Sequence, residues 1–452
     1  MNVDAEFRAV AVVGVGQEGA GFNDLEMIDE GMENARVAAG VGARALQLQG
    51  CTDVFVESME YAEQAAEESA LAVWRYNTNK RRRDRTLIPK LELYDSPYSD
   101  AWMQGRIAEP GPSPGRYAGQ SDDAHNLRPV NGGCPVPLLG IRGGTQHGLD
   151  RDKPILLLGK GITFNSGGLC LRPKDCLSMY RGCMSGAAAC VGVIRAAAAL
   201  SLPLNITALL PLGENMPSGM AAKPGDVVSL LNGKTLGFVD VSKAGVMAMA
   251  DPLLYAQTIY KPRMVVDIAT VGYAVCPALG GAAAGIFSNS NFVYKQFEKA
   301  GALTGDRVWR LPLWRYFKEL IMPNETLDIS NRGRGPASSC IAAAVLHELV
   351  PCVDWAHLDI RNVGMLTSYN PLPYLLKDRM TGRPTRTIVQ AGPDGNLLAF
   401  VGAAEPFCEA SFAQFEELSL NKRMEVVDKN EEATEEDDID VELRILWGSW
   451  TH

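Results

Sequence analysis

The sequence predicts an α/β protein made of a small N-terminal α/β domain and a larger C-terminal α/β domain with a mixed, mainly parallel central sheet. Continuous apolar runs at Ile155–Leu158, Ile206–Leu210 and Met264–Ala269 alternate with helical patterns such as Gly186–Leu200 and Gly245–Tyr255. Strands that are apolar at every position are buried on both faces, which is typical of a parallel sheet covered by helices. In addition, 452 residues, of which 46% are hydrophobic, are enough to bury a large core and to form two domains.

The composition narrows the classes of function. The net charge is −10 and no basic cluster dominates, which argues against nucleic acid as the main partner. The one basic run, Lys80–Arg83, is interpreted as a solvated face. No apolar run reaches the length needed to cross a bilayer, and no secretory signal is visible at Met1. Ten cysteines at irregular spacing favour a reducing compartment over a disulfide framework. We therefore expect a soluble intracellular protein.

The N-terminal domain is expected over residues 1–95, beginning with a strand at Ala9–Val15 and a literal GxGxxG at Gly14–Gly19. A dinucleotide site would also need an acidic residue at the end of the second strand, about twenty residues further on. The predicted second strand, Arg44–Leu48, is followed by Gln49 instead. We therefore favour a tight turn before a helix, with a nucleotide site as the alternative.

The remaining N-terminal elements follow from capping and periodicity. Asn23 is the expected N-cap of a helix at Asn23–Ala38, and Glu26 three residues later completes a capping box. Three more elements are expected in order: a strand at Val54–Val56, an amphipathic helix at Tyr61–Tyr76 and a strand at Leu87–Leu93.

Residues 96–150 are rich in proline and glycine, as in EPGPSPGRY and PVNGGCPVP, and this composition predicts an irregular linker. The C-terminal domain is expected over 151–408. The tail, 409–452, carries the acidic run EEATEEDDIDVE, which cannot form a core of its own. Its apolar end, Leu443–Trp450, is predicted either to dock on a neighbour or to remain a disordered extension.

Several short motifs follow one another along the C-terminal two thirds of the chain. They are GKGITFNSGG (159–168), GENMPSG (213–219), KPGD (223–226), VDVSKAGVMAMAD (239–251), WAHLD (355–359) and GRP (382–384). Together they resemble the signature segments of the leucyl aminopeptidase family, the cytosol aminopeptidases of peptidase family M17. The resemblance implies the two-domain fold of that family, an assembly of two trimers into a homohexamer, and a site for two zinc or manganese ions.

In this family a Lys amine, three Asp and one Glu bind the two ions, and a second Lys and an Arg assist catalysis. The matching ligand positions here are Lys160, Asn165, Cys183, Ser242 and Ala244, and the matching catalytic positions are Arg172 and Val246. The ligand lysine is retained, but all four carboxylates are missing. Arg172 is still cationic, yet it is planar and cannot be deprotonated, and Val246 carries no charge.

The resemblance therefore implies that the family's metal site is lost, with no metal cofactor and no catalytic residue. Two divalent ions beside Lys160 and Arg172 would meet repulsion that neutral oxygens and a thiol cannot offset. One alternative is an active metallo-aminopeptidase with a remodelled site, in which Cys183 and Lys160 hold a single ion. Another is an anion-binding module for a carboxylate or phosphate, whose cationic pocket would be formed by Lys160, Arg172, Arg332 and Arg334.

The leading interpretation is a catalytically inactive, leucyl-aminopeptidase-like structural protein that acts as an oligomeric scaffold. The pattern of lost ligands is most similar to that of the sperm leucyl aminopeptidases of insects, which are associated with the crystalline matrix of sperm mitochondrial derivatives. That resemblance implies a mitochondrial location, with a cytoplasmic one expected otherwise; no transit peptide is visible at Met1. A homohexamer is expected, or mixed hexamers with active paralogues, without nucleic acid or membrane partners.

Overall fold

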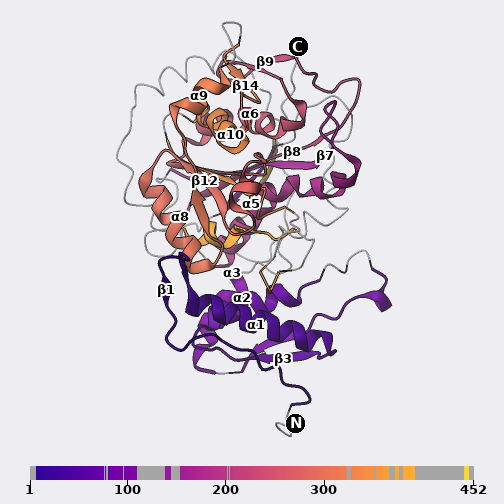
Figure 1. The fold of residues 1–452 in the computed structure, drawn as a ribbon, viewed down its shortest axis with the longest axis vertical. Helices are drawn as coiled ribbons and strands as arrows, with labels where there is room; N and C mark the ends of the chain where they lie inside the picture. The colour runs from indigo at the N-terminus through magenta and orange to yellow at the C-terminus, as the bar shows by residue number, and fades with distance from the viewer. Residues whose placement is uncertain are drawn as a thin grey trace.

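The computed structural model describes residues 7–108, 138–143, 153–391 and 442–446, apart from short gaps at 76, 78–79, 95, 201, 203, 323–326, 351–352, 366–371 and 376–379. Figure 1 shows a smaller, helix-rich body that contains the N-terminus and a larger body built around a sheet. The predicted small N-terminal and larger C-terminal α/β domains are confirmed. The predicted boundaries between them lie in or next to segments outside the described residues, and they stay predictions.

The N-terminal body is built around two packed helices and a short parallel pair of strands. α1 (Glu30–Leu48) packs against α2 (Ala62–Val73), and β3 (Asp53–Val56) pairs with β4 (Lys90–Leu93). Alanines dominate the shared core, which includes Ala39, Ala43, Ala62, Ala65 and Ala66. Because the separation of packed helices depends on the side chains between them, these small residues let the helices approach closely. The predicted strand–helix–strand order in this region is confirmed.

Two N-terminal strand predictions and one helix start are wrong. Ala9–Val15 forms no strand, so the GxGxxG motif lacks the strand that a dinucleotide site requires. Arg44–Leu48 is the last part of α1, because a short apolar run fits a buried helix segment as well as a strand. The helix begins at Glu30, where the Asp29 carboxylate accepts a hydrogen bond from the Met32 N–H at 2.9 Å.

Asn23, the predicted N-cap, is instead the last residue of β1 (Phe22–Asn23), which pairs antiparallel with β2 (Ile28–Asp29) ahead of α1. Its side-chain oxygen accepts from the N–H groups of Leu25 at 2.9 Å and Glu26 at 3.1 Å. The Asn23 side chain therefore accepts backbone hydrogen bonds as an N-cap does, but in the turn after β1 and not at the start of α1.

The C-terminal body is built on a sheet with nine strands within the described residues. Their order is β13 (Val308–Arg310), β12 (Ala284–Ser288), β15 (Asp354–Asp359), β11 (Met264–Ala269), β6 (Ile155–Gly159), β8 (Ile206–Asn215), β5 (Leu138–Gly143) and β16 (Glu442–Leu446), with β7 (Gly161–Asn165) paired to β8. The central strands β15, β11, β6 and β8 are parallel, whereas β12 joins β15 and β5 joins β8 antiparallel. The predicted mixed, mainly parallel sheet is confirmed.

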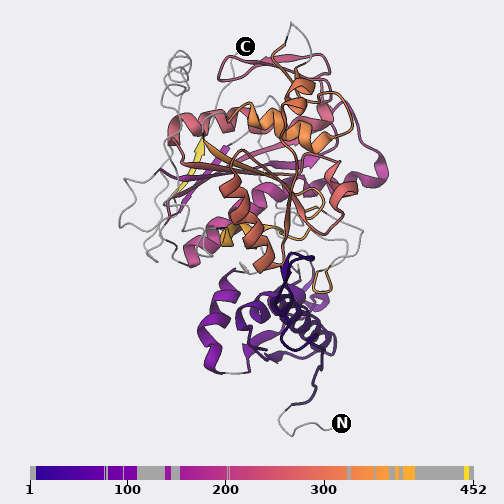
Figure 2. The ribbon, with the colours of Figure 1, turned by 60° about the vertical axis from the view of Figure 1, so that its left-hand side comes forward.

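Helices cover both faces of this sheet, as the turned view of Figure 2 shows. One face packs against α5 (Ser185–Ala199), α8 (Asn291–Thr304) and α11 (Thr385–Gln390), and the other against α6 (Ala244–Tyr260), α9 (Arg315–Ile321) and α10 (Ser338–His347). Within β6, Ile155 and Leu157 face the first layer, and Leu156 and Leu158 face the second. This alternation explains why an inner strand is apolar at every position.

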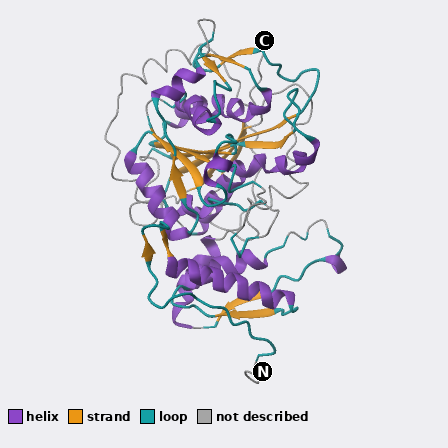
Figure 3. Cartoon of the chain, in the orientation of Figure 1, coloured by secondary structure: helices purple, strands orange, loops and turns teal. Residues whose placement is uncertain are grey.

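Smaller elements complete the large body, and Figure 3 separates them by type. They are the 3₁₀ segments η4 (Lys174–Met184) and η5 (Val241–Lys243), the short helix α7 (Val275–Leu279), and a three-stranded sheet of β9 (Val227–Ser229), β10 (Thr235–Gly237) and β14 (Ile329–Ser330). The two 3₁₀ segments lead directly into α5 and α6.

One helical stretch corrects the expectation that no apolar segment is long enough to cross a bilayer. η4 continues directly into α5, and the combined segment Lys174–Ala199 is long and apolar enough by length and composition. However, 78% of its most apolar window is buried inside the protein. Its hydrophobicity is therefore accounted for by its place in the core, where α5 packs on the sheet.

The segment predicted to be an irregular linker, 96–150, contains regular structure where it is described. α3 (Ser99–Ala108) packs on α2, and β5 joins the main sheet. The proline- and glycine-rich runs behind the prediction occupy 109–137, outside the described residues. In the tail, β16 pairs antiparallel with β5, so this part of the apolar end adds a strand to its own sheet. The other linker and tail predictions fall outside the described residues.

A buried ionic network joins the two bodies. Arg386 of α11 contacts Glu67 and Glu68 of α2 and also Asp306, which Arg383 binds at 2.6 Å. All five side chains are at most 7% exposed. Burial alone would raise the pKa of Asp306, but the charges of Arg386 and Arg383 outweigh it and hold that pKa below its ordinary value. The network therefore ties α2 to the large domain through compensated charges.

Arg386→Met is expected to lower the free energy of unfolding by about 3–5 kcal/mol, because the buried carboxylate of Glu68 would lose its guanidinium partner and Asp306 would keep only Arg383. Urea unfolding followed by circular dichroism measures the change. Arg315→Met is the matched control: its pair with Glu319 has side chains 88% and 61% exposed, and such pairs contribute about 1 kcal/mol or less. Equal effects from the two variants would contradict the proposed role of the network.

Candidate functional site

The candidate site lies where three neighbouring parallel strands end. β6, β11 and β15 are adjacent in the sheet, and each is followed within two residues by a side chain of the site, namely Lys160, Thr270 and Arg361. η5 and the first turn of α6 contribute Ser242, Lys243 and Val246. Open α/β sheets bind ligands outside the carboxyl ends of their strands, where the connecting loops converge.

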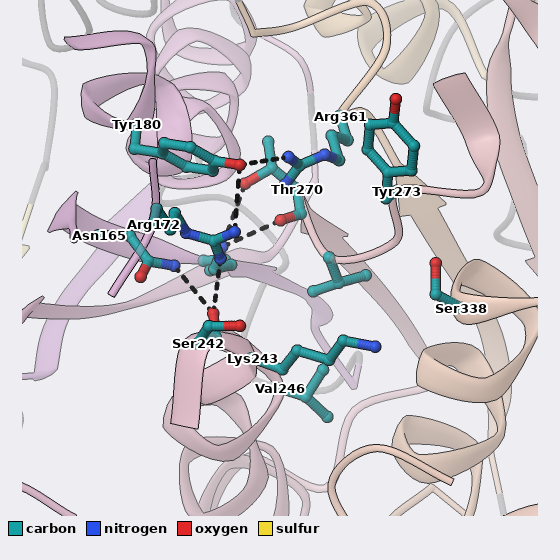
Figure 4. A pocket seen from close by; sticks show the side chains of 13 residues that line it. Asn165, Arg172, Tyr180, Ser242, Lys243, Val246, Thr270, Tyr273, Ser338 and Arg361 are labelled. Carbon is teal, nitrogen blue, oxygen red and sulfur yellow. Dashed lines mark hydrogen bonds between the residues drawn. The ribbon is translucent and has the colours of Figure 1, made fainter. Parts of the chain in front are cut away.

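A cavity of about 160 Å³ opens at this point (Figure 4). Four cationic side chains contribute to its wall, those of Lys160, Arg172, Lys243 and Arg361, and among the described residues no acidic side chain does so. The other polar side chains of the wall are Asn165, Tyr180, Ser242, Thr270, Tyr273 and Ser338. The cavity is therefore strongly positive.

Lys160 is buried in the wall of the cavity. It is 2% exposed, and its ammonium group donates to the carbonyl oxygen and the hydroxyl of Thr270 at 3.0 and 3.1 Å. Burial lowers its pKa below the ordinary lysine value, although a hydrogen bond to Cys183 and the charge of that sulfur act in the opposite direction. Gly245 makes room for the side chain, since a Cβ there would lie 2.0 Å from the Lys160 Cε.

Arg172 crosses the cavity from the loop before η4 to η5. Its Nη2 donates to the carbonyl oxygen of Ser242 at 2.7 Å, and its Nη1 donates to the Tyr180 hydroxyl at 3.1 Å. The guanidinium carbon lies 4.0 Å from the centre of the Tyr180 ring, a cation–π contact. Its Nε is buried without a hydrogen-bond partner among the described residues. The guanidinium thus keeps an unused donor inside the site.

The predicted anion pocket did not include two cations that line this cavity, Lys243 and Arg361. Arg361 donates to the Tyr180 hydroxyl at 3.0 Å, and its guanidinium carbon lies 5.7 Å from the centre of the Tyr273 ring. The Lys243 ammonium forms no hydrogen bond or ion pair with the described part of the chain. A signal for Arg361 was available, because it stands two residues beyond the WAHLD strand, at the edge where parallel strands end.

Arg332 and Arg334, the arginines predicted for an anion pocket, do not line the cavity. They lie exposed in the loop after β14, and the Arg334 N–H bonds the carbonyl of Leu320 at 3.1 Å, which folds the loop against α9. Arg332 still acts on the site from outside. Burial lowers the pKa of Lys243 most, Asp240 opposes this, and the charge of Arg332 adds to the lowering.

The other positions that carry family ligands or catalysts gather in the same place. Asn165, Ser242 and Val246 line the cavity, Cys183 is fully buried beside Lys160, and Ala244 begins α6. The side-chain oxygen of Asn165 already accepts from the Gly167 N–H at 3.0 Å and the Asn215 amide at 2.9 Å. Asn165 therefore acts as a structural amide that holds its loop.

Cys183 is a buried thiol beside Lys160. Burial would raise the pKa of its thiol, but the charges of Lys160, Arg361 and Arg172 outweigh burial and hold that pKa below its ordinary value. A thiolate here would offset one of the four positive charges of the cavity. It is enclosed by the protein and does not line the cavity wall.

These residues do not fit a pair of divalent metal ions. Such ions need several hard, anionic oxygen ligands. In the described part of the chain, no group of three or more His, Cys, Asp or Glu side chains is placed to hold a metal. The Asn165 oxygen is occupied, and Lys160 and Arg172 bring positive charge into the space.

The comparisons with known proteins bear on this site. The sequence profile of the cytosol aminopeptidase family, catalytic domain, matches residues 137–389, and that of the cytosol aminopeptidase family, N-terminal domain, matches residues 1–83. The chain belongs to the cytosol aminopeptidase family. This family consists of metallo-aminopeptidases, and the resemblance found in the sequence motifs is confirmed.

The sequences of individual relatives match this chain over most of its length. The cytosol aminopeptidase of Xenopus tropicalis is 35% identical over 425 residues, which span 85% of this chain and 81% of that protein. The human cytosol aminopeptidase is 34% identical over the same length, with 85% and 80% covered. Among solved structures, the bottromycin maturation enzyme BotP in complex with Mn has a TM-score of 0.68 at 24% identity, covering 79% of this chain and 86% of that one. That last likeness concerns the fold.

Lys160→Met is expected to raise the free energy of unfolding at pH 7 by about 1–4 kcal/mol, because methionine fills the space without a desolvated charge. The folded-state pKa of Lys160 lies below its ordinary value. The unfolded chain therefore binds the proton more tightly, and the wild type gains stability as the pH rises between the two values. The advantage of methionine should shrink toward pH 10.5.

Denaturant unfolding at pH 7 and pH 10 measures this difference. Lys223→Met is the control, because Lys223 has a side chain 62% exposed and its replacement should have a small effect at both values. A Lys160→Met variant that is less stable than wild type at pH 7, or whose advantage grows with pH, would show that Lys160 has an anionic partner stronger than the one described.

Proposed function

We propose that this member of the cytosol aminopeptidase family has lost the two-metal hydrolysis of peptides and acts as a non-catalytic, structural protein. One observation carries the proposal. The Lys160 ammonium and the Arg172 guanidinium share one cavity, and no carboxylate lines that cavity among the described residues. Arg172 is moreover bonded to Ser242, whose position matches a metal-binding Asp of the family.

Electrostatic repulsion is the reason why this observation argues against a two-metal site. At about 4 Å and an effective dielectric of about 20, a divalent ion and one fixed positive charge repel by about 8 kcal/mol. In a working site, carboxylates outweigh such repulsion. Here the replacements at the four carboxylate positions are an amide, a thiol, a hydroxyl and a methyl group. Val246, at the position of the family's catalytic arginine, also offers no charge to stabilise an oxyanion.

A scaffold role accounts for what the chain retains. The large domain keeps its apolar strands, its helices on both faces and the buried network to the small domain. We propose that it assembles as a homohexamer of two trimers, or in mixed hexamers with active paralogues. A place in the matrix of sperm mitochondrial derivatives is part of the proposal and rests on the sequence resemblance to insect sperm proteins.

The purified protein is expected to hold substoichiometric metal and to release no product from leucyl p-nitroanilide above the buffer rate. Elemental mass spectrometry after dialysis against zinc or manganese, followed by the peptidase assay, measures both quantities. The matched control is a variant that restores the family's groups by Asn165→Asp, Arg172→Lys, Cys183→Asp, Ser242→Asp, Ala244→Glu and Val246→Arg. The restored variant is expected to bind more metal than the wild type.

The outcome that contradicts the proposal is one or two tightly held ions per wild-type chain together with hydrolysis. Such a result would favour the remodelled metallo-aminopeptidase, in which Cys183 and Lys160 hold the ion. Cys183→Ser would then remove both the ion and the activity, whereas in the non-catalytic protein it changes neither.

The oligomeric state has its own test. Light scattering coupled to size exclusion is expected to give a mass six times the 48.8 kDa of one chain. Dilution over a range of concentrations shows whether the assembly is stable. A monomer at every concentration would overturn the scaffold role, while leaving the metal prediction unaffected.

A further inference from the structure

The cavity at the ends of β6, β11 and β15 has more positive charge than its surroundings compensate. Lys160, Arg172, Lys243 and Arg361 contribute four cations to one wall. We infer that this cavity binds a small oxyanion with two or more negative charges, of the phosphate or dicarboxylate type. The inference rests on the proposed absence of metal ions and names the ligand that takes their place.

The hydrogen-bond partners of these cations are mostly neutral. Lys160 bonds Thr270, and both Arg172 and Arg361 bond the Tyr180 hydroxyl. None of those partners brings a negative charge. Buried charges are costly unless they are paired. A thiolate at Cys183 would offset one charge of four, and Asp240 acts on Lys243 from outside the cavity wall. The imbalance favours a ligand with at least two negative charges over a monovalent one.

Two donors of the lining side chains have no hydrogen-bond partner among the described residues. The Arg172 Nε is buried and has no partner among the described residues. The Lys243 ammonium, which also forms no hydrogen bond or ion pair in the described part of the chain, lines the cavity, and Figure 4 shows its side chain extending away from Ser242 beside Val246. An oxyanion could therefore accept from a guanidinium and an ammonium at once, in charge-assisted hydrogen bonds.

The size of the cavity limits the ligand. About 160 Å³ is the liquid volume of about five water molecules. That space can enclose a phosphate group or a short dicarboxylate, but not a whole nucleotide. Guanidinium groups match the oxygens of both candidates in a bidentate manner. Tyr273 and Ser338 add hydroxyl groups to the wall, where they can hydrogen-bond a substituent of the anion.

The test is a titration of the full-length, metal-free protein with inorganic phosphate, malonate or chloride at constant ionic strength. Calorimetry and the thermal midpoint report binding. Saturable binding of phosphate or malonate, with a raised midpoint and no comparable effect of chloride, is expected. The anion that binds more tightly, phosphate or malonate, shows whether the ligand is of the phosphate or the dicarboxylate type.

Two variants locate the binding site. Lys243→Met and Arg361→Met are each expected to weaken binding about tenfold, because each removes a charged hydrogen-bond donor. Lys243 is the safer variant for folding, since it is only partly buried. Arg334→Met is the matched control: it removes a cation from the neighbouring loop outside the cavity, and it should leave the affinity unchanged.

Absence of saturable binding by metal-free protein would overturn this inference, and so would equal effects of Lys243→Met and Arg334→Met. In both cases the proposed loss of metal chemistry would stand. Stoichiometric metal in the purified wild type would instead overturn the proposed function. Elemental analysis of the same sample before the titration therefore separates the two failures.

Discussion

The parallel pairing of β11 with both β6 and β15 is the constraint on which the rest of the structure depends. Each strand of this trio is buried on both faces, so its register is set by the two helical layers. Once the register is set, the three carboxyl ends meet at one edge. Lys160, Thr270 and Arg361 must then be neighbours, although up to about two hundred positions separate them in the chain.

The same geometry that would gather carboxylates around metal ions gathers cations in this protein. A family scaffold does not specify the charge of its site; the side chains placed on it do. Here the substituted positions still converge, and their new chemistry is internally consistent. Arg172 bonds Ser242, Asn165 holds its own loop, and Gly245 leaves space for Lys160. The substituted side chains therefore bond neighbouring side chains and the backbone around the cationic groups.

Buried charge is treated in two different ways in this molecule. Between the domains, Arg383 and Arg386 meet Asp306, Glu67 and Glu68, so positive and negative groups compensate one another. At the candidate site the cations meet hydroxyl and carbonyl oxygens instead. In the network between the domains, the folded chain itself supplies both the positive and the negative charges. At the cavity, the compensating negative charge is left to an external anion. This contrast is the reason to regard the cavity as a binding site.

The sequence by itself predicted the inner strands β6, β8 and β11, the family and the motif positions that differ from it, because continuous apolar runs and ordered motifs are local properties of the chain. It failed at Arg44–Leu48, where local pattern does not distinguish strand from buried helix. Only the tertiary structure decided which cations share the cavity. Arg361 and Lys243 enter it, while Arg332 and Arg334 lie outside. The physical reason is that strand register and loop packing, which are long-range properties, determine where a side chain is placed.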